Sequence, residues 1–237
     1  MSKKLLHFSL LVLCLSAFAA AGLSAMDSGT VRFRTFGALV ASDELYYDCK
    51  GVETKVALYD SARSNFYEFT PGKPLVFYRL AKGADGKPVH EEAAVATITN
   101  AGVWPLLFFI PNSPVDKRFT VTALADDLKS FPFPSCRFIN QSDFAIDCKY
   151  GEQAVKLPAH GALLIDPRLK TGTSSETRYT TLSVVTPEGT RLLYSNNWVV
   201  RPNQRTLVFI ASQGDGIQVT RIVDDQCQYI DPALPPR

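Results

Sequence analysis

SCRFINQSDFAIDCKYGEQAVKLPAHGALLIDP, residues 135–167, opens the second half of the chain and is echoed in the first half. The run from Asp147 to Leu157 aligns with the run from Asp48 to Leu58 at an offset of 99 residues, and six of the eleven positions are identical. Both runs begin Asp-Cys-Lys and carry a glutamate three positions after the lysine. The chain therefore contains an internal repeat, and this stretch marks where the second copy begins.

Further landmarks recur in the same order in both halves. Arg32-Phe33 matches Arg137-Phe138, Leu107–Ile110 matches Leu207–Ile210 at an offset of 100, and Asp126-Asp127 matches Asp224-Asp225. Four ordered matches predict two tandem modules. The expected organisation is a signal peptide at 1–25, module one at 27–128, a linker at 129–134, module two at 135–226 and a tail at 227–237.

The periodic segments are strand-like. Val31–Phe36 and Arg118–Ala123 alternate apolar and polar residues, whereas Leu106–Ile110 is a continuous apolar run. Turn signals separate such segments, and no long stretch has a helical period. We therefore predict an all-β chain of two tandem immunoglobulin-like antiparallel β-sandwich modules, each with six or seven strands. A single larger barrel or sandwich that shares strands across the halves is the rival interpretation.

The linker at 129–134 carries two prolines and two phenylalanines. Proline restricts the backbone and blocks strand pairing, so the linker is expected to be stiff. We expect its phenylalanines to pack between the modules, which would hold the two modules at a fixed angle.

The N-terminus has the pattern of a secretory signal peptide. Lys3 and Lys4 precede an apolar run from Leu5 to Ala21, and small residues follow it. An uncleaved anchor is the alternative, but the run is short for the ~20 residues of a spanning helix. We predict an exported protein, periplasmic or extracellular, with no membrane span after cleavage.

Charge argues against nucleic acid as a partner. Cleavage removes two of the 25 basic residues and no acid, so 25 − 2 = 23 basic residues face 23 acidic ones. A mature chain with no net charge has no electrostatic attraction to nucleic acid or to an anionic membrane.

Four cysteines remain after cleavage, and an even number in an exported chain implies disulfides. Cys136 and Cys148 are equally distant from Ser142, so a tight antiparallel hairpin centred there would bring them together. By elimination Cys49 would pair with Cys227. The alternative, Cys49 with Cys136 and Cys148 with Cys227, stays open.

No motif for catalysis, a cofactor or a metal is found. GxSxG, HExxH, a P-loop and a dinucleotide fingerprint are absent, and only His90 and His160 follow the signal peptide. Both histidines are expected in solvated loops or turns. The acid pairs Asp126-Asp127 and Asp224-Asp225 recur at equivalent strand ends, so we expect solvated ends or turn caps rather than a carboxylate site. No catalytic, cofactor-binding or metal-ligating residue is predicted.

Aromatic residues are the best candidates for a ligand or partner surface, because exposed Trp and Tyr stack on sugars and anchor protein partners. The candidates are Trp104, Trp198, Tyr46, Tyr47 and Tyr67. Packing inside or between the modules competes with this interpretation, above all for the two tryptophans.

The segment Arg137–Asp143, with Val155–Leu157 and the turn at Pro158–Gly161, resembles a group of uncharacterised secreted bacterial tandem β-sandwich proteins. In these a similar RF-x-N-x-[ST] start precedes a small sandwich module. The resemblance implies the fold and no activity. Two modules behind a signal peptide are also similar in architecture to periplasmic pilus chaperones, although the motif residues of that family are not found here.

These observations predict an exported, non-enzymatic binding or scaffolding protein of the cell envelope. It would contact another envelope protein through its edge strands or aromatic surface, without a cofactor. The alternative is an envelope protein that binds a carbohydrate or hydrolyses a glycan.

Overall fold

A computed structural model describes residues 31–37, 44–70, 72–98, 104–113 and 116–226. These residues form sixteen β-strands and no α-helix, which confirms the all-β prediction. The N-terminal half, as we call strands β1–β8, comprises β1 (Val31–Gly37), β2 (Leu45–Cys49), β3 (Val52–Val56), β4 (Tyr67–Phe69), β5 (Leu75–Lys82), β6 (Pro88–Ala96), β7 (Pro105–Pro111) and β8 (Phe119–Ala125).

The C-terminal half, strands β9–β16, follows the linker. It comprises β9 (Ser135–Asn140), β10 (Ile146–Tyr150), β11 (Gln153–Leu157), β12 (Ala162–Ile165), β13 (Glu176–Thr186), β14 (Gly189–Val200), β15 (Gln204–Gln213) and β16 (Gly216–Asp225). The expected signal peptide at 1–25, Cys227 and the rest of the tail lie outside the described residues. Among the described residues, no helix has the length and apolar character to cross a membrane.

Each half is a sandwich of two four-stranded sheets. In the N-terminal half the orders are β3-β2-β5-β6 and β4-β1-β7-β8, and in the C-terminal half they are β11-β10-β13-β14 and β12-β9-β15-β16. Phe33, Tyr47, Phe77 and Phe109 are among the side chains packed between the first two sheets. The core of the C-terminal half includes Phe138, Tyr150, Leu182 and Trp198. Alternate residues of each strand point to these cores, as the two-residue period of a strand requires.

The strand order repeats between the halves. Adding eight to every strand number of the N-terminal half gives the order in the C-terminal half, including the parallel pairs β1–β7 and β9–β15. Each of the four sheets takes its strands from one half, so the rival fold with shared strands is wrong for the described residues. Each half has eight strands and a parallel pair, whereas a constant-type immunoglobulin domain has seven antiparallel strands, so the order does not confirm that type.

Three of the four alignments in the predicted repeat are out of register. The β2–β3 hairpin turns after Cys49 and the β10–β11 hairpin turns after Tyr150, an offset of 101 rather than 99. Arg34, and not Arg32, corresponds to Arg137, because the two pair with Leu106 and Leu207.

The third alignment is that of β7 with β15. Leu106 pairs with Leu124 on β8, and Leu207 pairs with Ile222 on β16. Leu124 and Ile222 differ by 98 residues, the same offset as Asp126 and Asp224, so they occupy equivalent positions. Their partners Leu106 and Leu207 are then equivalent, as are Phe108 and Phe209, at an offset of 101 rather than 100. A slip of one residue exchanges the faces of a strand, so the apolar letters aligned at 100 do not mark equivalent positions.

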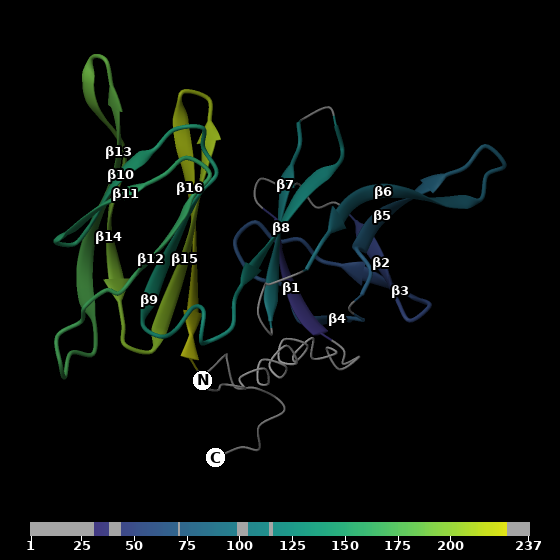
Figure 1. The fold of residues 1–237 in the computed structure, drawn as a ribbon, viewed down its shortest axis with the longest axis horizontal. Helices are drawn as coiled ribbons and strands as arrows, with labels where there is room; N and C mark the ends of the chain where they lie inside the picture. The colour runs from purple at the N-terminus through teal and green to yellow at the C-terminus, as the bar shows by residue number, and fades with distance from the viewer. Residues whose placement is uncertain (1–30, 38–43, 71, 99–103, 114–115, 227–237) are drawn as a thin grey trace, which may run out of the picture.

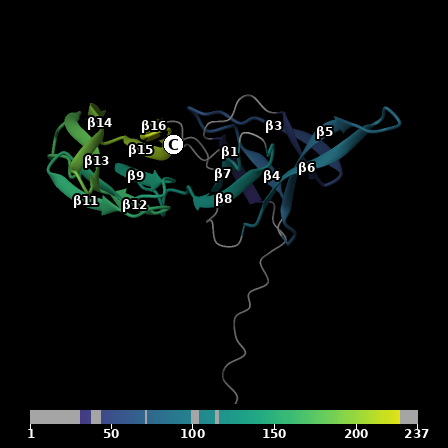
Figure 2. The same cartoon turned by 90° about the horizontal axis from the view of Figure 1, so that it is seen from above.

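The sheets β4-β1-β7-β8 and β12-β9-β15-β16, which we call the inner sheets, pack against each other (Figures 1 and 2). They do so through the faces that point away from their own sandwich cores. We call the other two sheets the outer sheets. The apolar side chains between them come from β1, β7, β8, β9, β15, β16 and the linker: Phe36, Leu106, Phe108, Ile110, Leu124, Phe131, Ile139, Leu207, Phe209 and Ile222. Phe209 stacks on Phe108 with ring centroids 3.9 Å apart and on Phe36 at 4.6 Å. The described molecule is therefore a stack of four sheets with three apolar layers.

Candidate functional site

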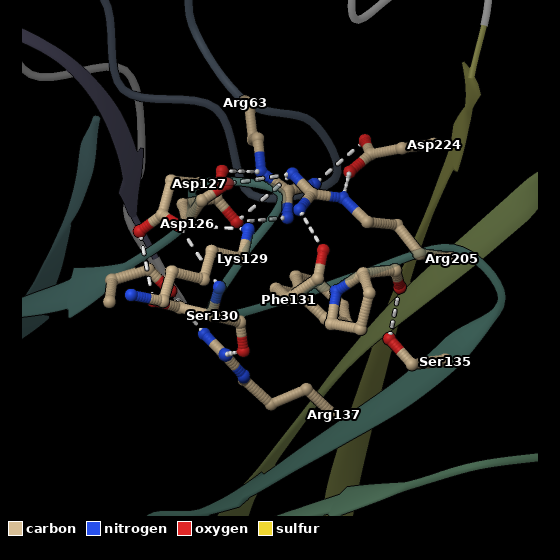
Figure 3. Close-up of polar contacts among 12 residues, drawn as sticks. Arg63, Asp126, Asp127, Lys129, Ser130, Phe131, Ser135, Arg137, Arg205 and Asp224 are labelled. Atoms are coloured by element: carbon tan, nitrogen blue, oxygen red, sulfur yellow. Dashed lines mark hydrogen bonds and ion pairs between the residues drawn. The ribbon is translucent and has the colours of Figure 1, made fainter. Parts of the chain in front are cut away.

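A cluster of buried charges lies beside the apolar contact between the halves, and we call Arg63, Asp126, Arg205 and Asp224 the junction network (Figure 3). Arg63, in the loop before β4, donates from Nε to Asp126 Oδ2 at 2.9 Å and from Nη1 to Asp224 Oδ1 at 2.7 Å. Arg205 on β15 donates from Nε to Asp224 Oδ2 at 3.1 Å and from Nη2 to the Asp126 carbonyl at 3.0 Å. Both arginines therefore bridge an aspartate of each half.

The junction network corrects the expectation that Asp126 and Asp224 are solvated strand ends. Their side chains are 5% and 8% exposed, and those of Arg63 and Arg205 are 3% and 0% exposed. Burial raises the pKa of the Asp224 carboxyl, against the lowering effect of Arg63 and Arg205. Guanidinium groups within the protein bind both carboxylates. Asp126 and Asp224 are therefore structural residues and do not face the solvent.

The linker completes the junction. Phe131 is fully buried, its carbonyl accepts a hydrogen bond of 2.6 Å from Arg205 Nη1, and the guanidinium groups of Arg137 and Arg205 lie over its ring at 4.5 Å and 4.4 Å. Arg137 also donates to the carbonyls of Ala125 and Ser130. Both arginines belong to the C-terminal half, whereas the apolar cluster that contains Phe131 also includes side chains of the N-terminal half. Phe131 therefore packs between the halves as the sequence led us to expect, and Phe133 is half-buried.

Asp127 is a turn cap, as expected. Its carboxylate accepts hydrogen bonds from the backbone N–H groups of Lys129 at 2.9 Å and Ser130 at 3.0 Å, and from the Ser130 hydroxyl at 2.9 Å. Burial raises the pKa of the Asp127 carboxyl, but the hydrogen bonds outweigh it and leave the pKa below its usual value. The charged carboxylate therefore orders the start of the linker.

Replacing Asp127 by asparagine is expected to lower the free energy of unfolding by about 1 kcal/mol at pH 7. Because the folded-state pKa is lowered, the wild-type contribution is fully present above the ordinary pKa of ~3.9 and is lost as the pH falls through the folded value. Urea unfolding of both proteins at pH 7 and at pH 3 measures the difference, which should shrink at pH 3. An equal difference at both pH values would contradict the role of the charge.

The structure does not bring the five candidate aromatic residues together. Trp198 is 2% exposed in the core of the C-terminal half, and its Nε1 donates to the Tyr194 hydroxyl at 3.1 Å. Tyr47 is buried and donates to the Glu68 carbonyl at 2.7 Å, and the half-buried Tyr67 accepts from Ala57 N at 2.8 Å. These three side chains pack and bond within the sandwiches.

Trp104 and Tyr46 lie nearer the surface. Trp104 is half-buried, with its ring centroid 5.9 Å from that of Phe66, and Phe66 itself lies under the guanidinium groups of Arg32 and Arg34. Tyr46 is half-buried on β2, with its side chain on the outer surface of the sheet β3-β2-β5-β6, since its neighbour Tyr47 points to the core.

Tyr46 belongs to a group that we call the aromatic face, which consists of Tyr46, Glu53, Tyr78 and His90. Each of the four strands of the outer sheet supplies one of these residues. The ring of Tyr78 stacks on that of Tyr46 with centroids 6.3 Å apart and on that of His90 at 3.9 Å. Glu53 Oε2 accepts from the Tyr78 hydroxyl at 3.1 Å and lies 3.3 Å from His90 Nε2. The face is thus an ordered row of rings with one carboxylate.

A cavity of about 510 Å³ adjoins the aromatic face, and its lining includes Tyr78, His90, Glu92, Lys50, Lys73 and Val76. The His90 side chain is 59% exposed and its ring stacks on that of Tyr78, which is 7% exposed. Burial and Glu53 raise the pKa of Tyr78 to about 12, so its hydroxyl stays protonated and donates to that carboxylate. The rings are therefore held in place before any ligand arrives.

Glu53, Tyr78 and His90 were not predicted from the sequence as members of a site. His90 lies on β6 and not in a solvated loop, and it reaches Tyr78 because β5 and β6 pair in antiparallel register. The pairing of Tyr46 with Tyr78 likewise depends on the register between β2 and β5. Leu75–Tyr78 is apolar throughout and Val89–Glu92 does not alternate, so no local pattern marks this face, and only the register shows that these rings share it.

The predicted disulfide between Cys136 and Cys148 is wrong for this structure, in which both side chains are buried free thiols. The prediction assumed that β9 and β10 form a hairpin, but β9 pairs with β12 and β15, and β10 pairs with β11 and β13. Burial raises the pKa of Cys148 to about 12 and that of Cys136 well above its usual value. Cys49 is also a free thiol, and its predicted partner Cys227 lies outside the described residues.

Within the described part of the chain, no group of three or more His, Cys, Asp or Glu side chains is placed to hold a metal ion. No family model and no curated protein matches the sequence. Among solved structures, a "putative cell adhesion protein" from Bacteroides uniformis is similar at 10% identity and a TM-score of 0.22, over 83% of this chain and 99% of that chain. At this TM-score the likeness carries no argument about the fold or function of the chain.

Proposed function

We propose that the chain is an exported, non-enzymatic binding or scaffolding protein of the cell envelope that contacts another protein through the aromatic face. The stacked rings of Tyr46, Tyr78 and His90 beside the cavity are the observation that supports this proposal. Aromatic side chains that are already ordered lose little conformational entropy on binding, which makes them effective anchors.

The neighbouring apolar side chains favour a protein partner. Val76 on β5 lies directly opposite Val95 on β6, and the two are 39% and 41% exposed. Val76 also lines the cavity, so the apolar pair is continuous with the aromatic face. A row of rings next to branched aliphatic side chains resembles the centre of a protein interface more than a purely polar sugar site.

The duplicated organisation supports a scaffolding role. We infer that residues 27–128 and 135–226 are two copies of one immunoglobulin-sized module, and that residues 1–25 direct export and are then removed. The junction network and the stacked phenylalanines join the two halves over their inner sheets. Such a junction keeps the outer sheets of both halves at a constant separation, as a rigid spacer requires.

Replacing both Tyr46 and His90 by alanine tests the binding role. We expect the immobilised wild-type protein to retain an envelope protein from an extract, and the double variant to bind it about 30-fold more weakly, the loss typical of an interface anchor. The matched control is Tyr179→Ala, which removes a ring that is 50% exposed on β13 of the other half. Equal retention by the double variant and the control would contradict the proposal.

Carbohydrate binding is the alternative function. Of its candidate aromatic residues only Tyr46 still supports it, because Trp198 is in the core and Trp104 packs against Phe66. Protease treatment of the extract separates the two functions. Retention of a protein is abolished by that treatment, whereas retention of an envelope glycan survives it.

A further inference from the structure

Strand β14 forms an edge of the outer sheet β11-β10-β13-β14 and lies on the side of the molecule away from the N-terminal half (Figures 1 and 2). It is 12 residues long and pairs with β13 along one side. No strand of the described residues pairs with its other side. A free edge of this length presents a row of backbone N–H and C=O groups to which another strand can add.

The edge of β14 lacks the residues that usually prevent such pairing. From Leu192 to Val200 it contains no charged residue and no proline, and Leu192 and Val199 are 58% and 46% exposed. The corresponding edge strand of the N-terminal half, β6, begins with Pro88 and carries Glu91 and Glu92. Charges and proline are the common protection of a sheet edge, so β6 is protected and β14 is open.

The sequence of this edge is nearly symmetric about Asn196. Leu192-Leu193-Tyr194-Ser195 on one side is matched by Asn197-Trp198-Val199-Val200 on the other, so that polar, aromatic and aliphatic residues follow in the same order outwards. If two β14 strands pair antiparallel about a two-fold axis at Asn196, each polar, aromatic or aliphatic residue lies opposite a residue of the same class in the other copy. A sequence with this symmetry is complementary to a second copy of itself, as an isologous interface requires.

The faces of the strand agree with this pairing. Ser195 and Asn197 lie opposite Thr181 and Tyr179 on the outer face, whereas Tyr194 and Trp198 point to the core. In the two-fold pair Ser195 faces Asn197 of the second copy, and Tyr194 faces Trp198 of the second copy, so each pair shares a face.

A β-bulge limits the two-fold pairing to Leu193–Val199, because it places Leu192 on the outer face whereas Val200 points to the core. The register with β13 shifts between Leu182 and Ser183, and Leu193 has no partner there. Leu192 lies opposite Ser183 and therefore on the outer face, like Val199. Val199 of one copy can thus contact both leucines of the other, which covers the most exposed apolar side chains of the edge.

We propose that β14 is a homodimerisation edge, at which two copies of the chain pair antiparallel about Asn196 and join their outer sheets into one sheet of eight strands. The proposal is independent of the aromatic face, which lies on the other half. The contact consists of main-chain hydrogen bonds and a few apolar pairs, so its area is at the small end of specific interfaces. We expect a dissociation constant of about 1–10 μM.

Two double variants at the same positions test this pairing. Ser195→Lys with Asn197→Lys sets like charges opposite each other twice across the two-fold axis, and Ser195→Glu with Asn197→Lys sets opposite charges there. Sedimentation equilibrium should show a wild-type dimer at about 100 μM, a dissociation constant at least about tenfold weaker for the first variant, and no weakening for the second. Ala154→Lys, on the opposite edge strand β11, controls for added charge and should leave the dimer intact.

Thermal unfolding of each variant establishes that it folds. If the dilysine variant does not fold, Asn196→Lys replaces it, because it sets one lysine against its own copy. A wild-type monomer at about 100 μM overturns the proposal, and so does a dimer that both double variants leave unchanged or weaken equally. A wild-type monomer whose edge instead binds a strand of another protein would assign β14 to a different occupant, and would equally overturn pairing with a second copy.

Discussion

Replacing Arg205 by alanine should lower the free energy of unfolding by about 3–5 kcal/mol, the range found when one partner of a buried ion pair is removed. The Arg205 side chain is fully buried and donates to Asp224, to the Asp126 carbonyl and to the Phe131 carbonyl. Its loss leaves a carboxylate and two carbonyl groups short of donors where water does not reach. Chemical denaturation of the variant and the wild-type protein measures the difference.

Two further variants show whether the loss comes from uncompensated charge. Arg118→Ala breaks an ion pair with Asp116 on the surface, where the Arg118 side chain is 67% exposed, and should cost less than about 1 kcal/mol. Arg205→Met combined with Asp224→Leu removes the charge together with its donor and should be less destabilising than Arg205→Ala alone. If the double variant were the less stable of the two, the charge explanation would fail.

Replacing Phe209 by alanine should cost about 3–5 kcal/mol, the usual effect of truncating a buried phenylalanine. The ring stacks on Phe108 and Phe36 between the two inner sheets, so its removal opens a cavity at the junction and leaves both sandwich cores intact. In calorimetry we therefore expect one transition for the wild-type protein and two transitions, one for each half, for the variant.

The control for this variant is Leu164→Ala on β12, which removes a side chain that is 44% exposed and should change stability by less than about 0.5 kcal/mol. A Phe209→Ala protein that still unfolds in one transition, at an unchanged midpoint, would show that the junction contributes nothing to the coupling of the halves.

The all-β class and the order of the repeat could be predicted because they depend on local patterns. Alternation in Val31–Phe36 and Arg118–Ala123 marks strands. The shared Asp-Cys-Lys points to the equivalent strands β2 and β10, although its alignment is two residues out of register. Phe131 could be placed between the halves because an apolar residue in a short proline-containing linker has few other places to pack. Each of these inferences needs only neighbouring residues.

What could not be predicted depends on register and on distant contacts. Cys136 and Cys148 were paired on the assumption of a hairpin, but β9 and β10 belong to different sheets. Asp126 and Asp224 were expected in solvent because nothing near them indicates burial, and Arg63 is distant from both in sequence. The aromatic face was found only at Tyr46, because its other residues come from three other strands. Non-local pairings of this kind leave no trace in the sequence around each residue.

The junction also bears on how such a chain arises. Phe108 and Phe209 occupy equivalent positions and stack on each other, and the equivalent Asp126 and Asp224 both bind Arg63. Contacts between equivalent positions are what two identical subunits make across a symmetry axis. A gene of half this length could have assembled the same four layers from two separate molecules. Fusion of two such genes would then have freed one copy to acquire Arg205 where the other has Trp104, so that an interface once constrained to be symmetric could diverge.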